Sequence, residues 1–231
     1  VRRSGDHLQA SARASPPLST TGSVRRSGDH MQAKGSWADG PPLSCIFAKA
    51  LAQAPVEKPV ALKVAGRVSF KQVTDDGAAL KEGGPVRPYW RRVKELYLES
   101  VQLTDEAGEA IAIALARAGT AVRVLKLGWN PDLSRQAALA LGCLLVANNS
   151  IQELWLNSCE LGDEAGAELL EALARRSEAS SALRVLRLDR NGLGARAAGA
   201  AAAALRAGTL PALETLSLVG NDFSESDEAS I

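Results

Sequence analysis

The stretches IQELWLNSCEL (residues 151–161), LRVLRLDRNGL (183–193) and LETLSLVGNDF (213–223) share one pattern of leucines. Each has a Leu-x-Leu core with another apolar residue three positions before it, and the same pattern opens two earlier units as VKELYL and VRVLKL. The five units begin at residues 93, 122, 151, 183 and 213, so they are spaced by 29, 29, 32 and 30 residues. A repeat of this period cannot bury its own apolar face, and neighbouring units must therefore stack on one another.

The first part of each unit predicts a short strand, with the leucines pointing inward and the residues between them pointing outward. Three residues after the last strand leucine stand Asn130, Asn191 and Asn221, with Cys159 in the same register and Val101 as the one departure. A buried amide at this point can bond backbone groups of the turn that would otherwise be unpaired. We therefore expect an asparagine ladder along the turns, weakened where cysteine replaces asparagine.

The second part of each unit predicts a helix, because apolar residues recur at shared offsets with helical spacing. In the first unit these are Leu103, Ala107, Ala110, Ile111, Ala114 and Leu115. Only Glu168 breaks the pattern in the third unit. Thr104, Ser134 and Asp163 stand where N-caps belong, and the acids Asp105, Glu106 and Glu164 would favour the positive end of the helix dipole.

Units of one strand and one helix with the motif LxxLxLxxN/CxL resemble the ribonuclease-inhibitor subfamily of leucine-rich repeats, over roughly residues 93–223. The resemblance implies an α/β leucine-rich repeat solenoid. We expect a short curved arc with the parallel sheet on the concave side and the helices on the convex side, because helices are wider than strands. Proteins that resemble this family, including Ran-type GTPase activators and NOD-like receptors, grip other proteins with such surfaces.

Three regions follow from these patterns. Residues 93–231 are predicted to be the leucine-rich repeat domain, with four full repeats and a truncated fifth. Residues 45–92 are interpreted as a poorly defined N-terminal cap or a degenerate repeat, with a weak helix at Ile46–Ala54 and short strands within Val60–Phe70. Residues 1–44 contain VRRSGDHLQA again as VRRSGDHMQA at residues 24–33, and they are predicted to be a disordered tail. The only methionine is Met31, so we expect either a fragment or a translation start inside the second copy.

The outward strand residues, stacked by repeat, form the candidate binding face. The central row is Tyr97, Lys126, Trp155, Arg187 and Ser217, and the row two residues later is Glu99, Gly128, Asn157, Asp189 and Val219, with Trp129 and Arg190 beside them. Exposed Trp, Tyr and Arg dominate binding energy at interfaces. We predict a protein-binding site made of Tyr97, Glu99, Lys126, Trp129, Trp155, Asn157, Arg187, Asp189 and Arg190. The alternative is that the aromatic rings only stack on neighbouring cations.

The sequence favours binding over catalysis. The two histidines, His7 and His30, lie in the duplicated tail, and no nucleotide-binding glycine motif is present, so we expect no enzyme, cofactor or metal site. Cys143 and Cys159 are interpreted as small buried residues. With 27 basic and 26 acidic residues the chain predicts neither nucleic acid nor membrane as a partner.

The hypothesis is a non-enzymatic module that binds an unidentified protein through the concave face, in the cytoplasm, since the cysteines show no disulfide framework. One alternative is a GTPase-activating regulator resembling the Ran-type activators. The other is a detached fragment of a larger protein of the NOD-like receptor type.

Overall fold

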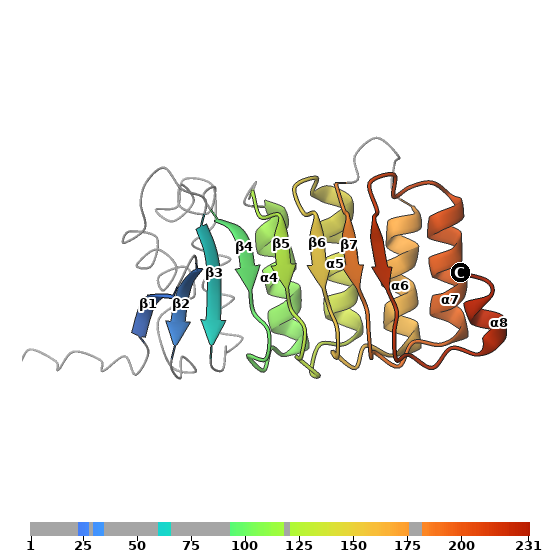
Figure 1. Ribbon diagram of the computed structural model, residues 1–231, viewed down its shortest axis with the longest axis horizontal. Helices are drawn as coiled ribbons and strands as arrows, with labels where there is room; N and C mark the ends of the chain where they lie inside the picture. Colours follow the sequence, from blue (N-terminus) through green and yellow to red (C-terminus); the bar gives the residue numbers. More distant parts are fainter. Residues whose placement is uncertain (1–22, 28–29, 35–59, 66–92, 118–120, 176–181) are drawn as a thin grey trace, which may run out of the picture.

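The computed structural model describes residues 23–27, 30–34, 60–65, 93–117, 121–175 and 182–231 (Figure 1). The five Leu-x-Leu segments form parallel strands that pair in the order of the sequence. They are β4 (Val93–Tyr97), β5 (Val124–Lys126), β6 (Glu153–Trp155), β7 (Val185–Arg187) and β8 (Thr215–Ser217). The strands thus lie where the leucine alternation predicts them.

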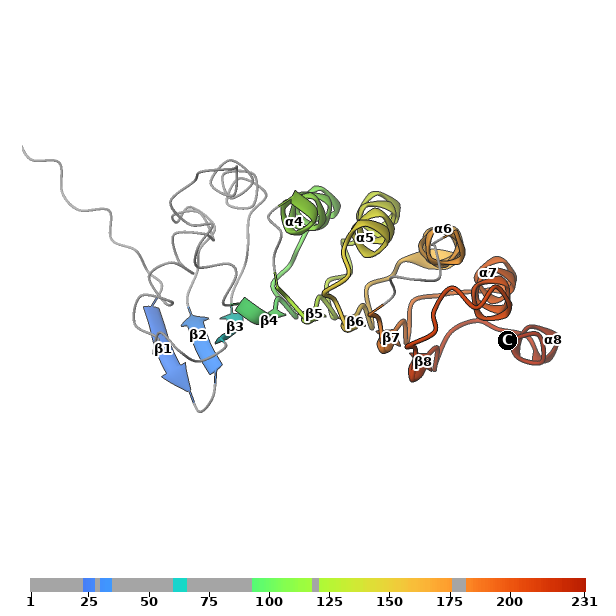
Figure 2. The ribbon, with the colours of Figure 1, turned by 90° about the horizontal axis from the view of Figure 1, so that it is seen from above.

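A helix follows each strand. The helices are α4 (Asp105–Arg117), α5 (Arg135–Ala147), α6 (Gly162–Ala174), α7 (Ala195–Arg206) and the four-residue α8 (Glu225–Glu228). In Figure 2 the helices follow the outer side of the arc and β4–β8 follow the inner side. The predicted α/β solenoid, with its sheet on the concave side, is confirmed. The last repeat carries a short helix where the sequence predicts a truncation.

The core is a continuous row of leucines between the sheet and the helices. Leu96, Leu125, Leu154 and Leu186 are neighbours in the strand register and are at most 2% exposed. Burial of a leucine side chain stabilises the fold by roughly 1.5 to 3 kcal/mol. In α7 the buried face is made of alanines, which bring less apolar surface than the leucines of α5. Apolar stacking therefore joins every pair of adjacent repeats, more weakly at α7.

The asparagine ladder is present at three junctions. Asn130 accepts hydrogen bonds from the backbone N–H groups of Val101 and Leu103 in the preceding repeat, both at 3.1 Å. Its amide nitrogen donates to the carbonyls of Leu98 and Leu127 at 2.8 and 2.7 Å. Each asparagine thus satisfies the turn of the repeat before it as well as its own.

Asn191 and Asn221 bind the repeats before them in the same way. Asn191 accepts from Cys159 N at 2.9 Å and donates to Leu156 O at 2.8 Å. Asn221 accepts from Asn191 N and donates to Leu188 O at 2.8 and 2.9 Å. Cys159, at the junction of the second and third repeats, gives thiol contacts of 3.4 Å with Leu127 O and 3.7 Å with Asn157 O, which are weaker than the amide bonds. The prediction of a weakened ladder at the cysteine is confirmed.

At the helix N-termini, one of the three predicted N-caps is confirmed and two are wrong. Thr104 caps α4, accepting from Ala107 N at 3.4 Å, as predicted. The Ser134 side chain does not cap α5, and Asp163 lies inside α6. Instead, Asp105 accepts from Ser134 N and Ala137 N at 2.8 Å, at the start of the helix in the next repeat.

Asp163 has the equivalent role one pair of repeats later. Its carboxylate accepts from Gly194 N and Ala197 N, both at 2.8 Å, and from Arg196 N at 3.1 Å. Burial opposes ionisation of Asp105 and Asp163, but these hydrogen bonds outweigh it and lower the pKa of both carboxyl groups. The two acids therefore cap neighbouring helices rather than their own.

Glu168, which breaks the apolar pattern of α6, is buried and paired with Arg135 of α5. Arg135 Nε donates to Glu168 Oε2 at 2.9 Å, and its Nη2 donates to Oε1 at 2.5 Å. Arg135 holds the pKa of Glu168 below its usual range. At this junction an ion pair between helices stands where the neighbouring junctions have an aspartate cap.

Three further strands extend the sheet toward the N-terminus. β1 (Ser23–Ser27) and β2 (His30–Lys34) pair antiparallel, and β2 and β3 (Val60–Ala65) continue in parallel to β4. β1 and β2 lie in the segment predicted to be a disordered tail, and β3 lies in the predicted strand region of residues 60–70. The expected helix at 46–54 and the rest of residues 1–92 lie outside the described residues.

Candidate functional site

The centre of the concave sheet is a stack of alternating aromatic and cationic side chains. The strand register places Tyr97, Lys126, Trp155 and Arg187 side by side on β4–β7. Lys126 Nζ lies 3.4 Å from the centre of the Trp155 ring and 5.1 Å from that of Tyr97. Arg187 Cζ lies 4.2 Å from the Trp155 ring centre. The cation–aromatic stacking considered as the alternative is therefore present, and it builds one connected row.

Two glutamates fix the aromatic rings from the same strands. The Tyr97 hydroxyl donates to Glu95 Oε2 at 2.5 Å, and Trp155 Nε1 donates to Glu153 Oε2 at 3.1 Å. Burial and the neighbouring carboxylates, Glu95 first, raise the pKa of Tyr97 and keep it protonated. The predicted site omits both glutamates. They stand two residues before each ring, so the two-residue strand period was the signal that places them on the same face.

The two cations of the row have no carboxylate partner in the part of the chain that the structure describes. Within the described residues, no Asp or Glu oxygen lies within 4.0 Å of the charged atoms of Lys126 or Arg187. Arg187 Nε is buried and has no hydrogen-bond partner there. The polar atoms of the rings therefore donate hydrogen bonds to glutamates, whereas the two cations, among the described residues, contact ring faces.

In the second predicted row, which runs from Glu99 to Val219, Asp189 and Asn157 contact neighbouring repeats. The Asp189 carboxylate accepts from the Ser217 hydroxyl and from Val219 N, the latter at 3.0 Å. Asn157 lies over Gly128, where a Cβ atom would come within 2.7 Å of Asn157 Oδ1. Asn157 Oδ1 is buried and unpaired among the described residues. Asp189 thus supports the last strand, while Asn157 and the half-buried Glu99 remain part of the open face.

Trp129 and Arg190 lie one step beyond the sheet, in the turns. Both have left-handed backbone, with φ of 62° and 54°, and the equivalent residue of the last repeat is Gly220 at 73°. Trp129 is 51% exposed. A residue other than glycine in this region costs about 1 kcal/mol or more, so glycine would suit the backbone better than tryptophan here. The two side chains border the central row and do not join its stack.

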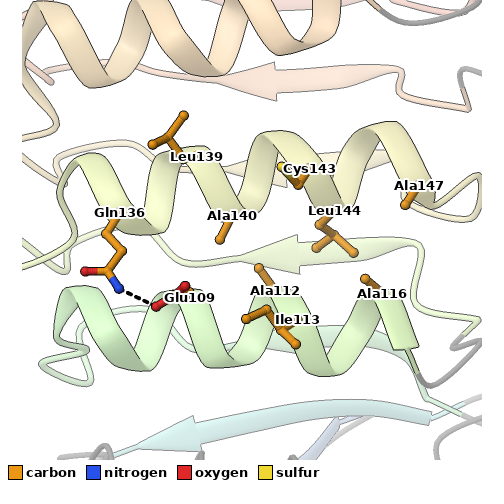
Figure 3. A pocket seen from close by; sticks show the side chains of 10 residues that line it. All are labelled: Glu109, Ala112, Ile113, Ala116, Gln136, Leu139, Ala140, Cys143, Leu144 and Ala147. Carbon is orange, nitrogen blue, oxygen red and sulfur yellow. Dashed lines mark hydrogen bonds between the residues drawn. The ribbon is translucent and has the colours of Figure 1, made fainter.

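The convex side holds an apolar groove of about 440 Å³ between α4 and α5. Figure 3 shows Leu139, Ala140 and Cys143 of α5 opposite Ala112, Ile113 and Ala116 of α4, with a hydrogen bond from Gln136 to Glu109 at one end. Cys143 is exposed in this groove, so the interpretation of Cys143 as buried is wrong. Cys159 is buried, and burial raises its pKa to about 11.

Two absences apply to the described part of the chain. It contains no group of three or more His, Cys, Asp or Glu side chains that could hold a metal ion. None of its helices is long and apolar enough to cross a bilayer.

Comparison with known proteins agrees with the fold. A family model described as leucine-rich repeat matches residues 147–170, which run from the end of α5 into α6. Ribonuclease inhibitor of Sus scrofa is 35% identical to this chain over 83 residues. That alignment covers 36% of this chain and 18% of the inhibitor, so the chain matches about a fifth of the relative's length.

Proposed function

We propose that this chain, a leucine-rich repeat protein similar to ribonuclease inhibitor, is a non-enzymatic module that binds another protein through the concave face of β4–β8. The observation that carries the proposal is the row of Tyr97, Lys126, Trp155 and Arg187, which is only half-buried at the centre of a sheet that no helix of the described region covers. Side chains of these types at the centre of a patch are the usual anchors of protein interfaces.

The stacking within the row supports binding as well as stability. Trp155 is held by Glu153 on its edge and by cations on its faces, so its rotamer is fixed before a partner arrives. Ordering a free side chain at an interface costs about 0.5 to 1.5 kcal/mol, and a preorganised ring avoids most of this cost. Trp129 and Arg190 would extend the contact beyond the strands.

We further propose a cytoplasmic location and a protein partner, not a nucleic acid or a membrane. Buried Cys159 in its free form suits a reducing compartment. The matched relative is named for inhibiting a ribonuclease. From that relative we carry over only the general mode, a protein held by the repeat surface. No contact among the described residues favours the GTPase-activating alternative over simple binding.

The test is site-specific photo-cross-linking of the full chain in lysate of its own cells. A photoreactive phenylalanine at Ser217 probes the concave row, and one at Leu139 probes the convex groove. We expect a discrete cross-linked protein from position 217 that position 139 does not give. The same cross-link must disappear when Trp155 and Arg187 are both changed to Ala in a chain that circular dichroism shows to be folded.

A matched variant, Arg175→Ala with Arg206→Ala, removes exposed cations from the helix ends and should leave the cross-link intact. If the Trp155 and Arg187 variant gives an unchanged cross-link, the concave row does not bind the partner. If only position 139 gives a product, the convex groove is the binding surface and the proposal is wrong.

A further inference from the structure

On the concave face, most acids have hydrogen-bond partners and the two central cations have no carboxylate partner among the described residues. This difference indicates the chemistry of the partner. Glu95 and Glu153 accept hydrogen bonds from Tyr97 and Trp155, and the second-row acid Asp189 accepts from Ser217 and Val219. No such counterpart of the cations flanking Trp155 is found among the described residues. Among the described residues, the sheet face therefore has three acids that accept hydrogen bonds within the protein, a fourth, Glu99, at its β4 edge, and two cations without a carboxylate partner.

The two free cations are held close together by one ring. Lys126 is on β5 and Arg187 is on β7, so they reach Trp155 on β6 from opposite sides. Their distances to the ring centre, 3.4 and 4.2 Å, place the two charged groups less than about 8 Å apart. Like charges at this distance repel, and an anionic group above the ring would relieve the repulsion.

An extended chain matches this spacing. Side chains two residues apart on an extended strand point to the same side and are separated by roughly 6.5 to 7 Å. Two carboxylates at positions i and i+2 can therefore bond Lys126 and Arg187 at the same time, across the Trp155 ring. Carboxylate bonds to ammonium and guanidinium groups are charge-assisted and stronger than neutral hydrogen bonds.

We propose that the concave face receives an extended acidic segment of the partner protein, with carboxylates at i and i+2 bridging Lys126 and Arg187 over Trp155. This inference rests on the proposed function. The segment crosses the strands, so its two acids fall on β5 and β7 while its backbone lies over β6. Arg187 Nε, buried and unpaired among the described residues, gains an acceptor when the guanidinium turns toward the segment.

The probe is a fluorescein-labelled peptide with an Asp-Gly-Asp centre in a Gly-Ser chain, titrated with the full protein and followed by anisotropy. Comparison peptides carry Asn-Gly-Asn, Lys-Gly-Lys, adjacent Asp-Asp, or phosphoserine at the same centre. We expect the Asp-Gly-Asp peptide to bind at least about tenfold more tightly than the Asn-Gly-Asn peptide, and more tightly than adjacent Asp-Asp. Raising the salt from about 50 to about 300 mM should weaken binding several-fold.

Variants of the protein test the two cations. Lys126→Gln and Arg187→Gln should each weaken binding of the Asp-Gly-Asp peptide by about threefold or more, and Lys126→Arg should retain it. Arg175→Gln, which removes an exposed cation at the end of α6, should leave it unchanged. Thermal melts of every variant show whether lost binding is only lost folding, and the Lys126→Arg result decides the matter if Lys126→Gln is destabilised.

Each other outcome has a defined meaning. Equal binding of the Asn-Gly-Asn peptide, or unchanged binding to both glutamine variants, overturns the acidic-segment proposal. Tighter binding of the phosphoserine peptide also overturns it, because a phosphate would then be the preferred anion. Binding of the Lys-Gly-Lys peptide that is lost with Trp155→Ala would refute this inference but leave concave-face binding intact. If no peptide binds while position 217 still cross-links a partner, this inference fails and the proposed function stands.

Discussion

The junction between the second and third repeats differs from the two junctions on either side of it. The first–second and third–fourth junctions each have an asparagine amide in the turn and an aspartate that caps the next helix. The second–third junction has Cys159 in the turn and the Arg135–Glu168 ion pair between the helices. The leucine rows run through all three without a break.

The comparison distinguishes two kinds of interaction between adjacent repeats, namely burial of apolar side chains and polar bonds. Apolar burial is the same kind of interaction at every junction, so it determines that the repeats stack into a solenoid. The polar bonds vary, and they decide how firmly one repeat is held to the next. Substitutions that remove the polar bonds at one junction, and not at its neighbour, therefore test how much each junction contributes to stability.

The largest effect is expected from Asn130→Ala. The change leaves the buried N–H groups of Val101 and Leu103 and the carbonyl of Leu98 without partners, at about 1 kcal/mol or more for each group. We expect a loss of about 3 kcal/mol in the free energy of unfolding, measured by urea denaturation. Asn157→Ala, at an asparagine outside the ladder, should cost far less. Equal losses for the two variants would mean that the ladder contributes little.

A smaller loss is expected from Asp163→Ala. The carboxylate caps α7 from the neighbouring repeat, and removal of an N-cap costs about 0.5 to 2 kcal/mol. Asp163→Asn keeps an acceptor oxygen and should recover part of the loss. If both variants are as stable as the original chain at pH 7, the cross-repeat cap is energetically unimportant.

The stabilisation by Asp163 should also depend on pH. The folded protein lowers the pKa of Asp163 below its ordinary value of 3.8, so folding favours the ionised form. Its contribution is fully present above about pH 5 and is lost as the pH falls through the lowered pKa. Urea denaturation from about pH 7 down to about pH 3 should show the stabilities of the original and the Asp163→Ala chains converging. A constant difference over this range contradicts the assignment of the cap to the carboxylate.

The smallest effect is expected at Cys159. Its thiol bonds the preceding repeat only weakly, so Cys159→Ala should cost about 1 kcal/mol, which is less than Asn130→Ala. Because burial raises the pKa of Cys159 to about 11, a thiol reagent at neutral pH should modify exposed Cys143 and spare Cys159. The labelling is best followed by mass spectrometry in a Cys45→Ser background. Rapid labelling of Cys159 would show that this junction opens in the native protein.

The sequence predicts the elements that depend on a pattern within one repeat. Leu-x-Leu marks the strands, the apolar offsets mark the helices, and the asparagine positions mark the ladder. The exposure of Cys143 could also have been deduced, since its offset is not one of the shared apolar positions, as with exposed Ile113 in α4.

The helix caps and the ion pair that local patterns do not predict each join two repeats. Asp105 caps a helix about thirty residues further on, and Glu168 is buried because Arg135 reaches it from the previous helix. Neither partner is visible in the local pattern, because a carboxylate near a helix start has the same sequence signature whichever helix it caps. The central row follows from the strand register, and the same two-residue period also places Glu95 and Glu153 on its face, although it does not show that they bond the rings. The use of the row for binding stays a prediction.

The cross-repeat caps also limit how a gene for such a protein can grow or shrink. Asp105 caps the helix of the second repeat and Asp163 that of the fourth, whereas Arg135, at the equivalent position of the second repeat, pairs with Glu168 of the third. Loss of two consecutive repeats brings matching partners together again, whereas loss of one repeat sets an aspartate against a helix that expects an arginine. For the helix caps of the first four repeats, the unit that can be lost without a mismatch is therefore a pair of repeats.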